Sequence, residues 1–189
     1  MPILDHFGIL APIYDRAIPL REAEKFIEKV GLPVNGTILD AGGGTGRVAS
    51  ALRDKASSTV VADLSFKMLT EAAAKGGLQL ACSHSEYLPF PAHSFDRVIM
   101  VDAMHHVCDH AETAEELYRV CAPGGRIVIL EPDIRKISVK LVALAEKIAL
   151  MRSHFISPTA INDLFLDQNK QSRIEMDGWN AWVIIDKHA

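Results

Sequence analysis

The sequence predicts an α/β fold in which helices cover both faces of a parallel, Rossmann-like sheet. Short apolar runs alternate with helical patterns along most of the 189 residues, and this alternation is typical of a doubly wound sheet. A glycine-rich turn follows the first apolar run, and such a turn lets the backbone approach a ligand closely. No repeat or low-complexity tract interrupts the pattern, so we expect a single domain.

The elements are expected in the following order. Apolar spacing predicts a first helix over residues 20–30, which Gly31 ends. Five strands follow at residues 37–40, 59–63, 78–82, 97–101 and 126–131, with helices between them at 46–55, 66–75 and 113–121. Ser65 is the expected cap of the helix at 66–75, and Pro123-Gly124-Gly125 is expected to turn into the fifth strand. Helices are then expected at 137–154 and 158–166, before a closing hairpin of 174–176 and 179–186 around Asp177-Gly178.

The spacing of the glycines in the turn indicates which kind of nucleotide-like ligand the chain binds. Gly42, Gly44 and Gly46 fit the pattern G-x-G-x-G. The dinucleotide fingerprint is G-x-G-x-x-G, and its last glycine would stand where this chain has Arg47. The turn therefore favours a nucleotide-like ligand other than NAD.

An acidic residue ends the second predicted strand. Asp63 follows Gly42 at close to the spacing of about 20 residues at which an acid accepts hydrogen bonds from ribose hydroxyls. The alternative is that Asp63 is only a turn residue before a helix, where aspartate is common. Together with the glycine turn, the functional interpretation suggests an adenosine ligand with a small polar tail.

Five segments in the correct order resemble class I S-adenosylmethionine (SAM)-dependent methyltransferases. They are Ile38-Leu39-Asp40-Ala41-Gly42-Gly43-Gly44-Thr45-Gly46, Ala62-Asp63-Leu64-Ser65 with Met68-Leu69, Glu86-Tyr87-Leu88-Pro89-Phe90, Ser94-Phe95-Asp96-Arg97-Val98-Ile99, and the run from Leu117 through Pro123-Gly124-Gly125 to Ile129. The resemblance covers about residues 36–132. It is strongest to the small-molecule subgroup that includes the ubiquinone and menaquinone C-methyltransferases.

The resemblance implies a seven-stranded sheet with an antiparallel last strand, and SAM as the cofactor. It divides the chain into an N-terminal lid and helix (1–35), a SAM-binding core (36–132) and a helical cover with a closing hairpin (133–189). Asp40 would lie near the methionine ammonium, Asp63 would bind both ribose hydroxyls, and adenine would lie between Leu64 and Leu88. The full set of expected cofactor-binding residues is Asp40, Ala41, Gly42, Gly44, Gly46, Asp63, Leu64, His84, Ser85, Glu86, Asp102 and Tyr14.

The adenine contact departs from the family pattern. Many relatives place an acid before the Leu-Pro-Phe segment to bind the adenine amino group, and this chain has Ser83-His84 there. A neutral ring nitrogen of His84 could accept that hydrogen bond instead. Backbone groups of Ser85 and Glu86 could also contact the ring.

The segment from Met104 to His110 is rich in histidine. The i, i+4 spacing of His106 and His110 suggests a zinc site, but paired histidines are frequent here in metal-free methyltransferases, so we expect no metal. His106 is the candidate catalytic residue, because a histidine with a near-neutral pKa suits proton removal from the methyl acceptor. We expect His106 to face the ligand and His105 to pack beneath the loop.

The acceptor is expected to be a small molecule, although its identity is not encoded in any motif. After the fourth strand the chain lacks the Asn/Asp-Pro-Pro-aromatic motif of DNA and amino-group methyltransferases. Tyr14 resembles the lid of related enzymes, and the alternative is that it packs. Residues 137–151 are apolar around most of a helix, which favours core contacts and a homodimer over a hydrophobic substrate pocket.

Composition indicates which binding partners and which cellular compartment to expect. A net charge of −4 without a basic cluster argues against nucleic acid. Three cysteines without a C-x-x-C pair favour reduced thiols in a cytoplasmic protein, and charges interrupt every long apolar run. A non-catalytic SAM-binding relative, a protein or RNA methyltransferase and an NAD-dependent oxidoreductase remain as alternatives.

Overall fold

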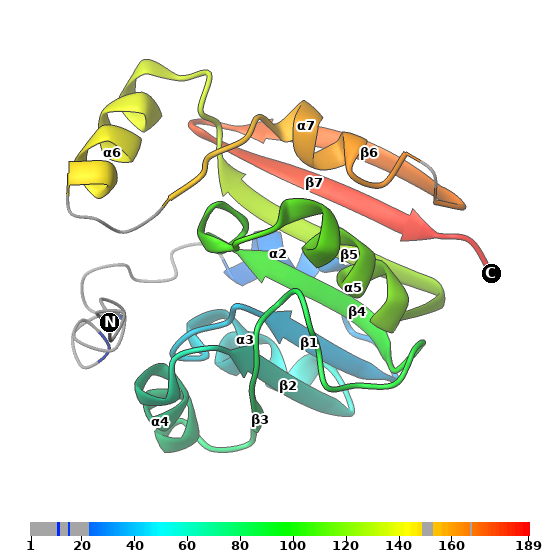
Figure 1. The fold of residues 1–189 in the computed structure, drawn as a ribbon. Coiled ribbons are helices and arrows are strands. Elements are labelled where there is room, and N and C mark those ends of the chain that lie inside the picture. Colours follow the sequence, from blue (N-terminus) through cyan, green and yellow to red (C-terminus); the bar gives the residue numbers. More distant parts are fainter. Residues whose placement is uncertain (1–10, 12–14, 16–22, 149–152, 167) are drawn as a thin grey trace.

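The computed structural model describes residues 11, 15, 23–148, 153–166 and 168–189. All seven strands in that part of the chain belong to one sheet, in the order β3-β2-β1-β4-β5-β7-β6 (Figure 1). The strands are β1 (Thr37–Ala41), β2 (Ser58–Asp63), β3 (Gln79–Cys82), β4 (Phe95–Val101), β5 (Cys121–Pro132), β6 (Lys170–Asp177) and β7 (Asn180–Lys187). The last strand, β7, is antiparallel to both of its neighbours, and β1 to β5 pair in parallel. The predicted fold class is confirmed.

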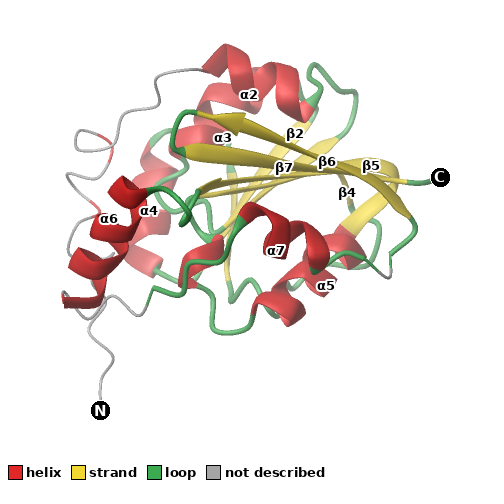
Figure 2. Ribbon diagram, turned by 90° about the horizontal axis from the view of Figure 1, so that it is seen from above, coloured by secondary structure: helices red, strands yellow, loops and turns green. Residues whose placement is uncertain are grey.

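Helices cover both faces of this sheet (Figure 2). The helices are α2 (Ala23–Val30), α3 (Arg47–Leu52), α4 (Phe66–Ala74), α5 (His110–Val120), α6 (Ile137–Ile148) and α7 (Pro158–Asp163), with 3₁₀ turns η1 (Arg53–Lys55) and η2 (Met104–His106). Apolar residues of α2 and α3 pack on one face of the sheet, and those of α5 and α7 pack on the other. Parallel strands buried in this way have their carboxyl ends at one edge, where open α/β sheets bind ligands.

Several element boundaries differ from the predicted ones for local reasons. Helix α5 begins at His110, three residues before the predicted start, because the Asp109 side chain accepts hydrogen bonds from the backbone N–H groups of Ala111 and Glu112. The stretch around Gly124 that was predicted as a turn belongs to β5. The strand is irregular there: its pairing with β4 shifts register, and Gly124 has a φ of +73°. The predicted helix 137–154 does not continue through residues 153 and 154, which are irregular.

Helix α6 stands at the carboxyl-end edge of the sheet (Figure 1). Val139 on this helix is buried, whereas Ile137, Leu141 and Leu144 are exposed. In the part of the chain that the structure describes, no helix is long and apolar enough to cross a membrane. The homodimer suggested by this apolar surface remains a proposal.

Candidate functional site

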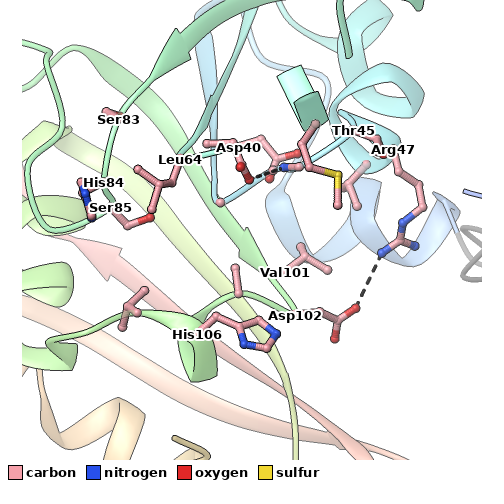
Figure 3. A pocket seen from close by; sticks show the side chains of 18 of the residues that line it. Asp40, Thr45, Arg47, Leu64, Ser83, His84, Ser85, Val101, Asp102 and His106 are labelled. Atoms are coloured by element: carbon pink, nitrogen blue, oxygen red, sulfur yellow. Dashed lines mark hydrogen bonds and ion pairs between the residues drawn. The ribbon is translucent and has the colours of Figure 1, made fainter. Parts of the chain in front are cut away.

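A cavity opens at the carboxyl ends of β1, β2, β3 and β4 (Figure 3). Four segments line it, each at or after the end of a strand: residues 40, 42–45, 47 and 48 for β1; 63, 64 and 68 for β2; 83–86 for β3; and 101–103 and 106–108 for β4. These segments are far apart in sequence and meet because parallel strands end at the same edge. The cavity therefore lies where the glycine turn and Asp63 predicted a ligand.

The glycine turn is shaped by contacts that leave no room for a side chain. A Cβ atom on Gly42 would lie 2.7 Å from the Cβ of Ala103, and one on Gly43 would lie 2.6 Å from the Cγ of Asp40. Gly42 also has a φ of +68°, which disfavours other residues. The turn thus forms a cavity wall of backbone atoms without side chains. Such a wall lets a ligand lie close to the backbone.

Asp40, at the end of β1, carries a carboxylate with an unused acceptor. The side chain is 1% exposed, and its Oδ2 accepts a hydrogen bond from the Ala49 N–H at 3.2 Å. Within the described residues, Oδ1 has no hydrogen-bond partner. Burial raises the Asp40 pKa to about 7, although the Ala49 N–H and the charge of Arg47 oppose the shift. A cationic ligand group that reached this oxygen would give it a partner and favour the charged form of the carboxyl.

Asp63, at the end of β2, already braces the site. Its Oδ2 accepts a hydrogen bond from the Gly44 N–H at 2.8 Å, and its Oδ1 accepts one from the Ser65 N–H at 2.8 Å. Ser65 in turn caps α4. The carboxylate therefore joins the glycine turn to the start of α4 and also lines the cavity, so its turn role does not exclude the predicted contact with ribose.

The loop after β3 is fixed to the loop after β4 by Glu86. This buried carboxylate accepts hydrogen bonds from the N–H groups of Cys108 at 2.7 Å and Asp109 at 3.3 Å. His84 lies at the rim, with its Nδ1 3.8 Å from Glu86 Oε2. Ser85 lines the same part of the cavity. The Glu86 side chain thus holds the two loops together, and the predicted contact between its backbone and adenine stays a prediction.

Arg47 and Asp102 face each other on the opposite side of the cavity from His84 (Figure 3). The Arg47 Nη2 atom lies 3.6 Å from Asp102 Oδ2, and the Arg47 side chain is 13% exposed. Asp102 has a φ of +52° and donates its N–H to the Leu130 carbonyl at 2.9 Å. This backbone fixes Asp102 at the end of β4, while Arg47 reaches it on a flexible side chain.

The two neighbouring histidines lie in different surroundings. His106 lines the cavity, and burial and the charge of His105 lower its pKa to about 3. His105 is buried, its Nδ1 lies 2.5 Å from Glu131 Oε2, and its ring stacks on Phe155 with centroids 4.1 Å apart. His106 is therefore neutral near pH 7 and a much weaker base than the near-neutral pKa expected from the sequence would give.

The structure places some predicted residues away from the cavity. Ala41 and Leu88 lie in the hydrophobic core. A Cβ atom on Gly46 would lie 2.9 Å from Leu78 Cδ1, so this glycine serves helix packing. Tyr14 lies outside the described residues.

Other residues line the cavity without having been predicted. They are Gly43, Thr45, Arg47, Val48, Met68, Ser83, Val101, Ala103, Val107 and Cys108. Gly43 could have been found from its place inside the motif. Thr45 lies in the same motif, and the others depend on how α3, α4 and the loops after β3 and β4 pack.

The described residues contain no group of three His, Cys, Asp or Glu side chains that could hold a zinc ion. His106 ends η2 and His110 begins α5, so the two do not share one helix.

Comparisons with known proteins agree with this architecture. Residues 39–129 match the family described as a methyltransferase domain. The chain is 30% identical over 146 residues to the ubiquinone/menaquinone biosynthesis C-methyltransferase UbiE of Geotalea daltonii, a match that covers 68% of this chain and 62% of that protein. The chain therefore spans less than two thirds of the length of this curated relative, and about half of several others.

Solved structures show the same fold. A SAM-dependent methyltransferase from Aquifex aeolicus has a TM-score of 0.73 at 18% identity, with 95% of both chains covered. A geranyl diphosphate methyltransferase, solved with GPP and sinefungin, has a TM-score of 0.70 at 16% identity, with 87% of this chain and 75% of that chain covered. The chain thus contains a class I methyltransferase domain, whose cofactor is SAM, and is similar to the UbiE C-methyltransferases.

Proposed function

We propose that this protein transfers a methyl group from SAM to a small acceptor with an apolar part. The observation that carries the proposal is the cavity itself, in which a wall of bare glycine backbone adjoins the buried, unsatisfied Oδ1 atom of Asp40. A ligand with a cationic group and an adenosine part fits these features, since Asp63 lies beside the same wall.

Different residues of the cavity would bind different parts of the cofactor. Asp40 would bind the ammonium of the methionine part, and Asp63 would bind the ribose hydroxyls. Leu64 would cover one face of adenine, and His84 with Ser85 would contact its edge. When bound, SAM supplies a methyl group on a positively charged sulfur, a good leaving group. The protein's main task is then alignment of the acceptor with that methyl group.

The acceptor would approach beside the loop after β4. Ala103, Val107 and Cys108 line this part of the cavity next to His106, which supports an acceptor with apolar surface. The relatives named as quinone C-methyltransferases and the structure of the geranyl diphosphate enzyme agree with that class. A neutral His106 would orient the acceptor by a hydrogen bond, because a ring of such low pKa removes protons poorly.

Calorimetry tests the proposal without knowledge of the acceptor. We expect SAM and S-adenosylhomocysteine to bind with micromolar affinity, about −8 kcal/mol, and NADH to give no heat. Saturable NADH binding with no response to SAM would overturn the proposal in favour of an oxidoreductase. Binding of SAM without methylation of any quinol, phenol or prenyl acceptor would favour the non-catalytic alternative.

A further inference from the structure

The charges around the cavity are strongly asymmetric. Among its described lining residues, four carry carboxylates (Asp40, Asp63, Glu86 and Asp102) and only Arg47 carries a permanent positive charge. Three of the carboxylates, those of Asp40, Asp63 and Glu86, already accept backbone N–H groups. A bound carboxylate would therefore be repelled from most of the wall and attracted at one place.

Arg47 is available for such a group. Its guanidinium carries five N–H donors, and in the described part of the chain it makes no side-chain hydrogen bond. Its ion pair with Asp102, at 3.6 Å, is longer than a hydrogen bond. The side chain is nevertheless mostly shielded from water, so an added carboxylate would form a stronger pair here than on an open surface.

Arg47 also lies close to the end of the cavity that holds Asp40. Its charge is one of the influences that act on the Asp40 carboxyl, and both residues flank the glycine turn. An α-amino acid carries its ammonium and carboxylate on one carbon atom. Asp40 and Arg47 present one partner of each sign in the wall of the same cavity.

We propose that Arg47 binds the carboxylate of the cofactor's methionine part, moving from Asp102 to the ligand, and so selects a cofactor with an intact amino-acid tail. The inference rests on the proposed function and adds to it a residue that determines cofactor specificity. Asp102 stays in place because the backbone at the end of β4 holds it, and Arg47 moves by side-chain rotation alone. In the absence of a ligand, the pair with Asp102 limits the cost of keeping the guanidinium inside the cavity.

Binding measurements with two ligands distinguish a role of Arg47 in carboxylate binding from a purely structural role. S-adenosylhomocysteine has the amino-acid tail, whereas 5′-methylthioadenosine has the same adenosine and a thioether but lacks the tail. We expect Arg47→Met to weaken S-adenosylhomocysteine binding about 10- to 100-fold and to change 5′-methylthioadenosine binding less than about twofold. Arg47→Lys, which keeps the charge but not the fork of donors, should fall between Arg47→Met and the parent.

Arg53→Met is the matched control, because Arg53 follows α3 and its guanidinium binds the carbonyls of Lys75 and Gly76 outside the cavity. It removes the same charge nearby and should leave both affinities unchanged. Equal losses for both ligands in Arg47→Met, or no loss for either, would overturn the inference. If the parent protein itself fails to bind S-adenosylhomocysteine, the proposed function fails instead.

Discussion

At the scale of a single residue, the raised pKa of Asp40 predicts that cofactor binding depends on pH. Its pKa of about 7 lies above the ordinary carboxyl value, so much of the ligand-free protein carries a protonated Asp40 below pH 7. An ammonium ligand needs the ionised form, and binding at low pH must therefore release a proton. We expect the affinity for S-adenosylhomocysteine to rise from pH 5.5 to pH 8 and then level off.

The same shift predicts a stability effect of opposite sign. The folded state binds the Asp40 proton more tightly than the unfolded state, so this group's contribution to stability falls as the pH rises from about 4 to 7. Asp40→Asn, which keeps the acceptor for the Ala49 N–H, should stabilise the ligand-free protein at pH 8 by roughly 1–4 kcal/mol. Urea unfolding measures this. The exposed Asp54→Asn variant is the control, and equal behaviour of the two would contradict the prediction.

Asp63 should serve both the glycine turn and the ligand. Asp63→Ala removes the acceptor for the ribose and for the Gly44 N–H, and we expect it to weaken S-adenosylhomocysteine binding by about 1.5–3 kcal/mol. Asp63→Asn should lose less, because it keeps one acceptor oxygen. Ser65→Ala removes the adjacent helix cap alone and should lower stability without the same loss of affinity. If Asp63→Ala binds like the parent while folding normally, the residue is a brace only.

At the scale of elements, Glu131 ties the loop after β4 to the segment before α7. Its carboxylate accepts the Met104 N–H at 2.7 Å and contacts His105, whose carbonyl accepts the His154 N–H at 2.6 Å. Glu131→Ala would leave buried donors unpaired, and we expect a loss of about 3–5 kcal/mol in the free energy of unfolding. Glu131→Gln, which retains an acceptor for Met104, should lose clearly less. Equal losses in the two variants would contradict this account, because Gln keeps both the side-chain volume and an acceptor for Met104, and the effect would then come from the lost charge beside His105.

At the scale of the whole molecule, the sequence predicted the architecture because the central strands are largely buried and the helices carry apolar stripes. The glycine turn and Asp63 were predictable for a related reason, since each lies directly after a strand whose end is fixed by the sheet. The start of α5 was missed because the capping residue Asp109 stands inside a run of histidine, cysteine and acid that suggested chemistry.

Local sequence patterns could not predict the contacts between segments that are distant in the chain. His105 and Glu131 meet because β4 and β5 are adjacent, and no local pattern signals the pair. In the sequence, Arg47 is informative only because it stands where a dinucleotide fingerprint has its last glycine. Its direction depends on how α3 packs after the turn, so its place in the cavity required the structure.

A crystal structure with S-adenosylhomocysteine tests the central claim most directly. We predict density for the ligand in the cavity at the ends of β1, β2, β3 and β4, with its ammonium at Asp40, its ribose at Asp63 and its adenine against Leu64. Density elsewhere on the molecule, or a cavity that stays empty at a ligand concentration well above the measured Kd, would contradict the account.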